Sequence, residues 1–148
     1  MNENERTASE ELFFLAHLVM HTGKLTESRL DGCLGDTCLS ATRMVTLRAI
    51  GLASEPLSLS QLAAQLSFVK SNVTQLVDRL EAEHLVRRIP DPDDRRSILL
   101  ELTDRGREEY HRALHLIEPV ENQLMTLYTS TERQQLTELL GRLRTAWH

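Results

Sequence analysis

The fold of this chain is decided by the stretch SQLAAQLSFVKSNVTQLVDRLEAEHLVRRIPDPDDRRSILLEL, residues 60–102. It opens with two short amphipathic segments, and the first of these has Ser60 as its predicted N-cap. The second segment repeats apolar residues at the spacing of a helix that buries one face: Val73, Leu76, Val77 and Leu80. A turn through residues 67–69 joins the two segments, so the pattern predicts a helix-turn-helix.

A β-hairpin is predicted immediately after the second helix. Two apolar runs, residues 85–89 and 97–102, lie on either side of a cluster of proline and aspartate at residues 90–94. Apolar and other side chains alternate from Ile98 to Leu102, which lets one face of the hairpin pack inward. We expect this hairpin to be the only appreciable sheet and to form the wing of a winged helix.

Two helices are predicted upstream of this region. Thr7 to Glu10 has the spacing of a capping box, and a long first helix is expected to run from there to about Leu30, with Gly32 and Gly35 breaking it. The second helix is expected to be capped by Ser40 and stopped by Gly51.

Two further helices are predicted downstream. Thr103 is expected to cap a long helix that reaches about Tyr128, and Pro119 should kink or divide it. A second capping box at Thr131–Gln134 starts the last helix. That helix carries a continuous apolar seam: Leu136, Leu139, Leu140, Leu143 and Trp147.

The first and last helices carry more apolar surface than a small middle domain can cover. Burial against a second copy of the chain is the simplest explanation, and a two-fold axis would suit a reader of paired DNA half-sites. The alternative is that the terminal helices pack only on one another and on the core.

Composition narrows the class of protein. The 148 residues are 41% hydrophobic and 26% charged, which is typical of one soluble globular domain. The apolar stretches are too short to span a membrane. Residues 1–11 are acidic and lack the basic segment followed by an apolar segment that is typical of a signal peptide. We therefore expect a cytoplasmic protein without a membrane partner. The net charge of −5 disfavours a nonspecific nucleic-acid coat, but six basic residues crowd between Lys70 and Arg96.

Two features of the central stretch suit a DNA duplex. The outer face of the second helix of the helix-turn-helix offers groups for base edges and phosphates: Lys70, Ser71, Asn72, Thr74, Gln75 and Arg79. The hairpin carries arginines that could enter a narrow minor groove: Arg87, Arg88, Arg95 and Arg96. Taken singly, each feature has an alternative interpretation. A polar helix face is also found on any solvent-exposed helix, and the hairpin arginines could form surface ion pairs with the aspartates of the turn.

The motifs in this stretch resemble the MarR family of winged-helix transcriptional regulators. The resemblance rests on SQLAAQL (60–66), SNVTQLVDRLE (71–81), DPDDRRS (91–97) and LELTDRG (100–106). It implies a homodimer with interlocking terminal helices, recognition helices in successive major grooves, and DNA affinity that a small molecule, oxidant or metal changes. By the same resemblance Arg96 is the minor-groove arginine and Asp94 orients it.

The sequence departs from the family pattern around the recognition helix. The family usually has glycine in the turn and serine or threonine as the N-cap, where this chain has Ser67 and Val69. Valine cannot cap a helix, and Lys70 adds a positive charge at its positive end, so an incoming phosphate would relieve both defects. His84 stands where the family commonly has the glycine that ends the helix.

Two kinds of sensor residue are candidates. Cys33 and Cys38 lie in the loop between the first two helices and could form a redox switch, or could be unreactive packed thiols. Two histidine pairs have the i, i+4 spacing of zinc ligands: His17 with His21, and His111 with His115. A zinc-responsive branch of the family uses such a pair on its fifth helix, but its further ligands would fall on Met44 and Val45 here. No metal or cofactor is therefore expected, and the histidines are a minority hypothesis.

No catalytic constellation is present, so we do not expect an enzyme. The predicted fold is mainly α, a winged helix-turn-helix with a small β-hairpin wing and N- and C-terminal dimerisation helices. Residues 1–33 and 107–148 are the expected dimerisation region, and residues 34–106 the DNA-binding domain. The predicted function is a homodimeric, ligand-responsive repressor that binds a pseudo-palindromic operator. The alternatives are a protein-interaction module that keeps the fold, and a metal- or thiol-sensing regulator.

Overall fold

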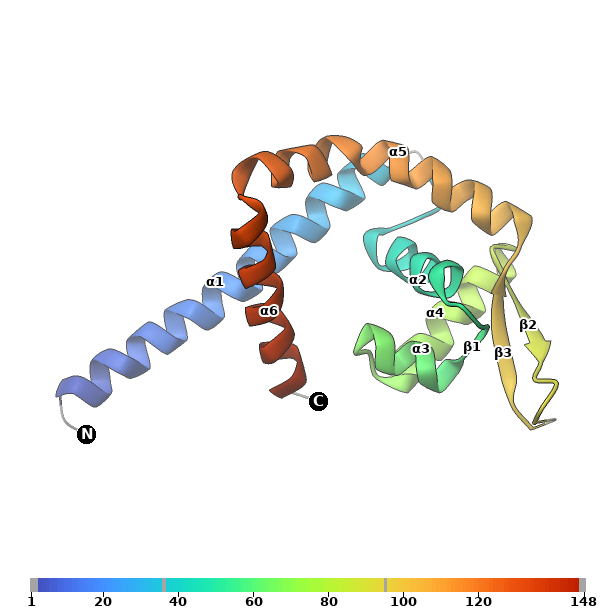
Figure 1. Cartoon of the computed structure of the whole chain (residues 1–148), viewed down its shortest axis with the longest axis horizontal. Helices are drawn as coiled ribbons and strands as arrows, with labels where there is room; N and C mark the ends of the chain where they lie inside the picture. Colours follow the sequence, from blue (N-terminus) through green and yellow to red (C-terminus); the bar gives the residue numbers. More distant parts are fainter. Residues whose placement is uncertain (1–2, 36, 95, 147–148) are drawn as a thin grey trace.

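The chain folds as a helical arch that ends in a small winged unit (Figure 1). The computed structural model describes residues 3–35, 37–94 and 96–146, with side chains from residue 10 onward. The described elements, in chain order, are α1 (Glu3–Leu34), α2 (Ala41–Leu52), β1 (Leu57–Ser58), α3 (Leu59–Leu66), α4 (Lys70–Ala82), β2 (Val86–Pro90), β3 (Ile98–Leu102), α5 (Asp104–Leu127) and α6 (Ser130–Ala146). Helices α3 and α4 and the β2–β3 hairpin confirm the predicted winged helix-turn-helix.

The sheet has three antiparallel strands in the order β1-β3-β2. In the hairpin, Val86 pairs with Leu102 and Pro90 with Ile98, while β1 adds Leu57 opposite Leu100. The hairpin was predicted, but β1 was not. A strand of two residues is too short to show the alternation by which strands are recognised in a sequence.

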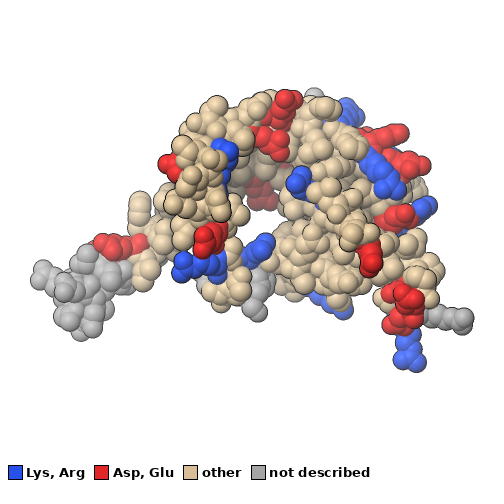
Figure 2. Space-filling view, in the orientation of Figure 1, with Lys and Arg blue, Asp and Glu red and all other residues tan. Residues whose placement is uncertain are grey.

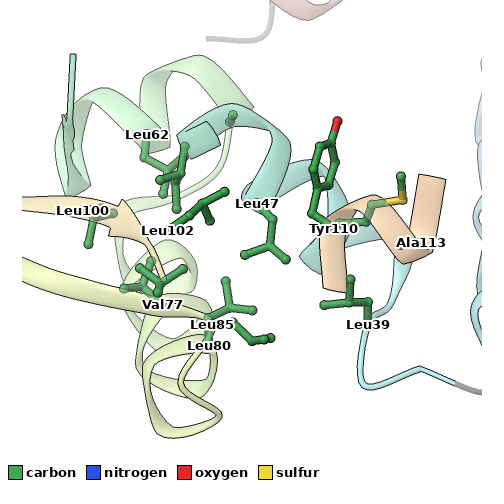
Figure 3. Packing of buried hydrophobic residues seen from close by; sticks show 14 of the residues in the cluster. Leu39, Leu47, Leu62, Val77, Leu80, Leu85, Leu100, Leu102, Tyr110 and Ala113 are labelled. Atoms are coloured by element: carbon green, nitrogen blue, oxygen red, sulfur yellow. The ribbon is translucent and has the colours of Figure 1, made fainter. Parts of the chain in front are cut away.

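One hydrophobic core lies between α2, α3, α4, the sheet and the first half of α5 (Figure 3). Its leucines come from different elements and are fully buried: Leu47, Leu62, Leu80, Leu85 and Leu100. Each contributes about 1.5–3 kcal/mol relative to an exposed side chain. This core fixes how α4 and the wing stand relative to each other.

The N-cap of α3 lies two residues before the predicted one. Ser58, not Ser60, is the N-cap: its hydroxyl accepts the Gln61 N–H at 3.3 Å, and the Gln61 side chain accepts the Ser58 N–H at 2.8 Å. The reciprocal box needs an amide or carboxylate three residues after the cap. Ser60 has the buried Ala63 at that position, so it cannot form one.

Helices α1 and α2 also differ from the prediction at their ends. Helix α1 starts at Glu3, so Thr7 lies inside it, and it runs through Gly32 to Leu34. Leu34 is fully buried in the core, and that packing outweighs the penalty of about 1 kcal/mol for a glycine inside a helix. Ser40 does cap α2, but α2 continues past Gly51, where a Cβ would lie 2.8 Å from a Leu102 methyl group.

Helix α5 begins as predicted, with Thr103 accepting the Gly106 N–H at 2.9 Å, and it continues undivided through Pro119. Figure 1 shows it arching from the wing toward α1. Helix α6 starts at Ser130 rather than after Thr131, because Thr129 and Glu132 exchange the capping hydrogen bonds. Trp147 lies outside the described residues.

Away from the C-terminal end of α1, the terminal helices leave most of their apolar side chains exposed. No described residue of α6 is buried, and Leu136, Leu139 and Leu140 are exposed. Along α1 the exposed apolar residues are Leu12, Phe13, Phe14, Leu15, Leu18, Met20 and Leu25. Among the described residues, no helix combines the length and the hydrophobicity needed to cross a bilayer.

Candidate nucleic-acid interface

Helix α4 owes its orientation to its buried stripe. Val73, Val77 and Leu80 are fully buried, and Leu76 packs partly against the core. The predicted reading residues on the other side of the helix are exposed: Lys70, Ser71, Asn72, Gln75 and Arg79. Thr74 is half-buried, and its hydroxyl donates to the Lys70 carbonyl oxygen at 3.0 Å. The helix therefore presents amides, a hydroxyl and two cations to whatever approaches it.

The start of α4 is open to an anion. Val69 is the N-cap residue and forms no side-chain capping bond, as its sequence indicates. The turn before it holds Ser67 with a left-handed φ of 56°, a conformation that favours glycine. Uncapped N–H groups and the positive end of the helix dipole suit a phosphate oxygen, and Lys70 reinforces that preference.

The tip of the wing is shaped by aspartates. Asp91 accepts the backbone N–H groups of Asp93 and Asp94, and Asp94 accepts the backbone N–H of Arg96 at 2.9 Å. The contact of Asp94 with Arg96 is thus through the Arg96 main chain. Arg96 is exposed, and its guanidinium forms no salt bridge with another described residue. The predicted contact residue Arg95 lies outside the described residues.

Charges of both signs lie together over the winged unit, and acidic side chains accompany basic ones at the hairpin (Figure 2). Arg87 illustrates this mixture, because its guanidinium pairs with Glu101 on the neighbouring strand at 2.6 Å. The face shown in Figure 2 is not a broad basic patch. DNA binding at such a surface depends on a few placed cations rather than on net charge.

Arg88, a predicted DNA contact, is paired with two acidic side chains of α4. Its guanidinium lies 2.5 Å from the Asp78 carboxylate and also pairs with Glu81, and only 24% of the side chain is exposed. Burial by itself would lower the pKa of Arg88, but hydrogen bonds and charge from Asp78 and Glu81 outweigh it and raise the pKa. Both acidic residues belong to α4. In this structure Arg88 therefore joins the wing to α4. The sequence signal that was missed is the i, i+3 spacing of the two acids just before a strand that contains the arginine.

The other end of α4 is tied to α2. Arg43 pairs with Glu83, the residue that ends α4, and also donates to the backbone oxygen of Cys38. The Arg43 Nε and the second Glu83 carboxylate oxygen are buried and find no hydrogen-bond partner among the described residues. No local pattern indicates this pair, because its members lie 40 residues apart.

The two cysteines are free and half-buried against the core. Burial raises the pKa of the Cys38 thiol, and the carboxylates of Glu109 and Glu83 raise it further against the opposing charge of Arg43. A raised pKa leaves less thiolate at neutral pH and so lowers reactivity toward oxidants. These surroundings favour the packed-thiol alternative for Cys38 over the redox switch.

A cavity of about 530 Å³ lies between α1 and α5. Its lining is mostly apolar and includes Leu25, Pro119 and Val120, with Cys33 at the edge toward the loop. Arg29 reaches across to Gln123, with its guanidinium donating to the amide oxygen at 2.9 Å. The cavity thus combines an apolar wall with a cation, as sites for small organic anions do.

The histidines occur as two separate pairs. The rings of His17 and His21 stack with centroids 5.9 Å apart on exposed α1, and His111 lies against Tyr110. His115 is exposed on α5. Within the part of the chain that the structure describes, no three metal-ligating side chains come together.

Comparison with known proteins places this geometry in a family. The sequence matches the MarR family over residues 39–98. It is 35% identical over 124 residues to the HTH-type transcriptional regulator PecS of Dickeya dadantii, covering 80% of this chain and 73% of PecS.

Solved structures agree. The chain resembles a mutant MarR from E. coli complexed with operator DNA, with a TM-score of 0.79, 25% identity and coverage of 90% of this chain and 95% of that one. It also resembles the transcriptional regulator BldR from Sulfolobus solfataricus, with a TM-score of 0.76, 28% identity and coverage of 96% and 99%. The chain therefore belongs to the MarR family: it is a DNA-binding, winged-helix regulator of transcription and not an enzyme.

Proposed function

We propose that the chain works as a homodimeric repressor in the cytoplasm, where each protomer reads one half of a pseudo-palindromic operator. The observation that carries this proposal is the exposed polar face of α4 together with the exposed Arg96 at the wing tip. Asn72 and Gln75 suit adenine edges in the major groove, while Lys70 and the uncapped start of α4 suit a phosphate. Arg96 suits the minor groove next to it.

The remaining predicted contact residues differ in how available they are for DNA. Ser71 and Arg79 are exposed on the reading face of α4, and Thr74 contributes its methyl group more readily than its already bonded hydroxyl. We keep Arg95 as a proposed contact on the basis of the sequence alone.

The dimer is supported by what the single chain leaves uncovered. Exposed apolar side chains line α1 and α6 and the end of α5, including Leu15, Leu124 and Leu139. Monomeric proteins rarely expose such contiguous apolar surface, and a second copy would cover it. We assign residues 1–33 and 107–148 to the dimerisation region, whose exposed apolar side chains form the interface, and residues 34–106 to the DNA-binding domain.

The α1–α5 cavity is our proposed site for a small-molecule effector. It adjoins the end of α1, where Asp31 accepts the Ala41 N–H at 2.6 Å and so holds the start of α2. A ligand that separates α1 from α5 would move α2, and with it the paired recognition helices. Such a change would alter the distance between half-sites, which sets DNA affinity.

Selection of bound fragments from the source genome, followed by a salt titration on the selected duplex, tests this function. Arg96→Ala should weaken binding about tenfold and reduce the salt slope by about one, since a charge contact is lost. Arg112→Ala, an exposed arginine on α5 that pairs with Glu109, is the matched control and should leave binding unchanged. Equal affinity of wild type and Arg96→Ala for every selected duplex would reject the proposed wing contact.

A further inference from the structure

We propose that Arg88 is a positioning residue for DNA recognition, which fastens the wing to the recognition helix so that both enter neighbouring grooves as one rigid body. The inference rests on the DNA contacts proposed above for α4 and the wing tip. It reassigns Arg88 from the predicted DNA contact to an internal clamp between the wing and α4, and it makes Asp78 and Glu81 parts of that clamp.

The geometry is that of a fork across two elements. Arg88 lies in the middle of β2, and its two terminal nitrogens bind different carboxylates, those of Asp78 and Glu81. The two acids stand three residues apart in α4 and so share one side of the helix. A planar guanidinium that binds two carboxylates fixes both distance and angle between strand and helix, which a single point charge would not do.

The neighbouring arginine shows what an ordinary wing arginine does. Arg87 points to the other face of the sheet, pairs only with Glu101 among the described residues, and is 60% exposed. Its pair stays inside the sheet and cannot fix the sheet against α4. Arg88 is 24% exposed, and its partners belong to another element.

The outer half of the wing needs such a fastening because the core ends at the level of Arg88. Val86 at the start of β2 and Leu100, which pairs with Arg88, are buried, whereas Pro90 and Arg96 are exposed. Without a contact to α4, this outer half would have to be ordered when DNA binds. Ordering beforehand removes that entropy loss from the binding step and so raises affinity.

Charge also argues against a phosphate contact. With Asp78 and Glu81 around it, the Arg88 cluster carries one negative charge in sum, which does not attract a phosphate. Freeing Arg88 for DNA would leave two carboxylates without a partner near the same surface.

A mutant cycle on the selected duplex separates the two roles. The proteins are wild type, Arg88→Gln, the double variant Asp78→Asn with Glu81→Gln, and the combination of all three. As a clamp, Arg88→Gln should weaken binding about five- to tenfold in wild type and less than about twofold in the double variant, where the clamp is already gone. The loss should persist at about 0.3 M salt, which screens simple repulsion.

The opposite pattern would overturn the proposal. If Arg88 contacts phosphate, the double variant frees it and binds DNA more tightly than wild type. Arg88→Gln would then reduce DNA affinity at least as much in the double variant as in wild type, and it would reduce the slope of affinity against salt concentration by about one. Arg107→Gln on α5 removes an exposed arginine outside the wing and is the charge control.

A second readout needs no DNA and reports on positioning alone. Amide hydrogen exchange in residues 86–102 should quicken in Arg88→Gln and in Glu81→Gln, while exchange in α2 stays as in wild type. Unchanged exchange in the wing of both variants would overturn the clamp. The variant Arg96→Ala separates the clamp from the proposed wing contact. If Arg96→Ala loses DNA binding and the mutant cycle shows Arg88 contacting phosphate, only the clamp is rejected. If Arg96→Ala binds DNA as wild type does, the wing contact itself is rejected.

Discussion

The winged unit and the terminal helices contrast in how their leucines are used. In the winged unit Leu47 and Leu100 are fully buried by elements of the same chain. On α6 the equally regular Leu136 and Leu139 are 41% and 57% exposed. The same helical spacing thus predicts an apolar face in both places, but it does not say whether the partner of that face belongs to the same chain.

The contrast has a consequence for stability. Isolated helices of fewer than about 15 residues are marginal in water, and longer ones gain most of their stability from packing. The 17 described residues of α6 bury none of their side chains within the chain. Its helix should therefore depend on a second copy and on protein concentration, whereas the winged unit should not.

The largest effect is expected from a charge placed on the apolar seam of α6. Leu139→Asp should turn the dimer into a monomer and weaken binding to a two-half-site duplex about a hundredfold or more, because the two half-sites are no longer bound together. Sedimentation and a binding titration measure the two effects. Gln134→Asp introduces the same charge on the opposite side of α6, and it should leave the oligomeric state and the binding to the duplex unchanged. A Leu139→Asp protein that stays dimeric would place the interface elsewhere.

A large effect confined to the winged unit is expected at Gly106. A Cβ at this position would lie 2.0 Å from the Leu85 carbonyl oxygen, where α5 packs on the turn after α4. Gly106→Ala should reduce the free energy of unfolding by about 3 kcal/mol. Gly23→Ala in α1 meets no atom of the described residues within 4 Å and should add helix stability instead. Denaturant titration compares the free energies of unfolding of the two variants. A lower free energy of unfolding in Gly23→Ala would show that the partner chain packs against Gly23.

The sequence predicted those features that local pattern controls. The caps at Ser40 and Thr103 and the hairpin follow from neighbouring residues and were confirmed. The predicted break of α1 at Gly32 was wrong, because the burial of Leu34 is decided by residues far along the chain, whereas Gly35, the second predicted break, does follow the last helical residue.

The candidate site shows the same division between local and distant information. The polar face of α4 followed from the position of its buried stripe, so its exposed residues could be named from the sequence. The ion-pair partners of Arg88 could not be named from the sequence, because the sequence shows which residues are charged but not which of them pair in space. Asp94 lies beside Arg96, but it acts through the backbone N–H.

A smaller effect tests the corrected cap of α3. Ser58→Ala removes a reciprocal capping box and should reduce the free energy of unfolding by about 1 kcal/mol. Ser60→Ala, at the position that the sequence favoured, is the matched control and should change it by less than about 0.5 kcal/mol. Equal losses would mean that Ser60 also satisfies an N–H group of the first turn.

The smallest effect concerns Cys38, which lies where the terminal helices meet the winged unit. In a Cys33→Ser background, Cys38 is the single thiol, and its raised pKa means less thiolate in the folded chain than in the unfolded one at the same pH. Alkylation at pH 8 should therefore be slower in native protein than in urea, and the gap attributable to ionisation should narrow as the pH rises through the folded pKa. Replacing Glu109 by Gln removes one of the charges that raise the pKa, so it should quicken the native reaction. A native thiol that reacts faster than the unfolded one would revive the redox switch, and it would place a sensor at the joint between the two regions.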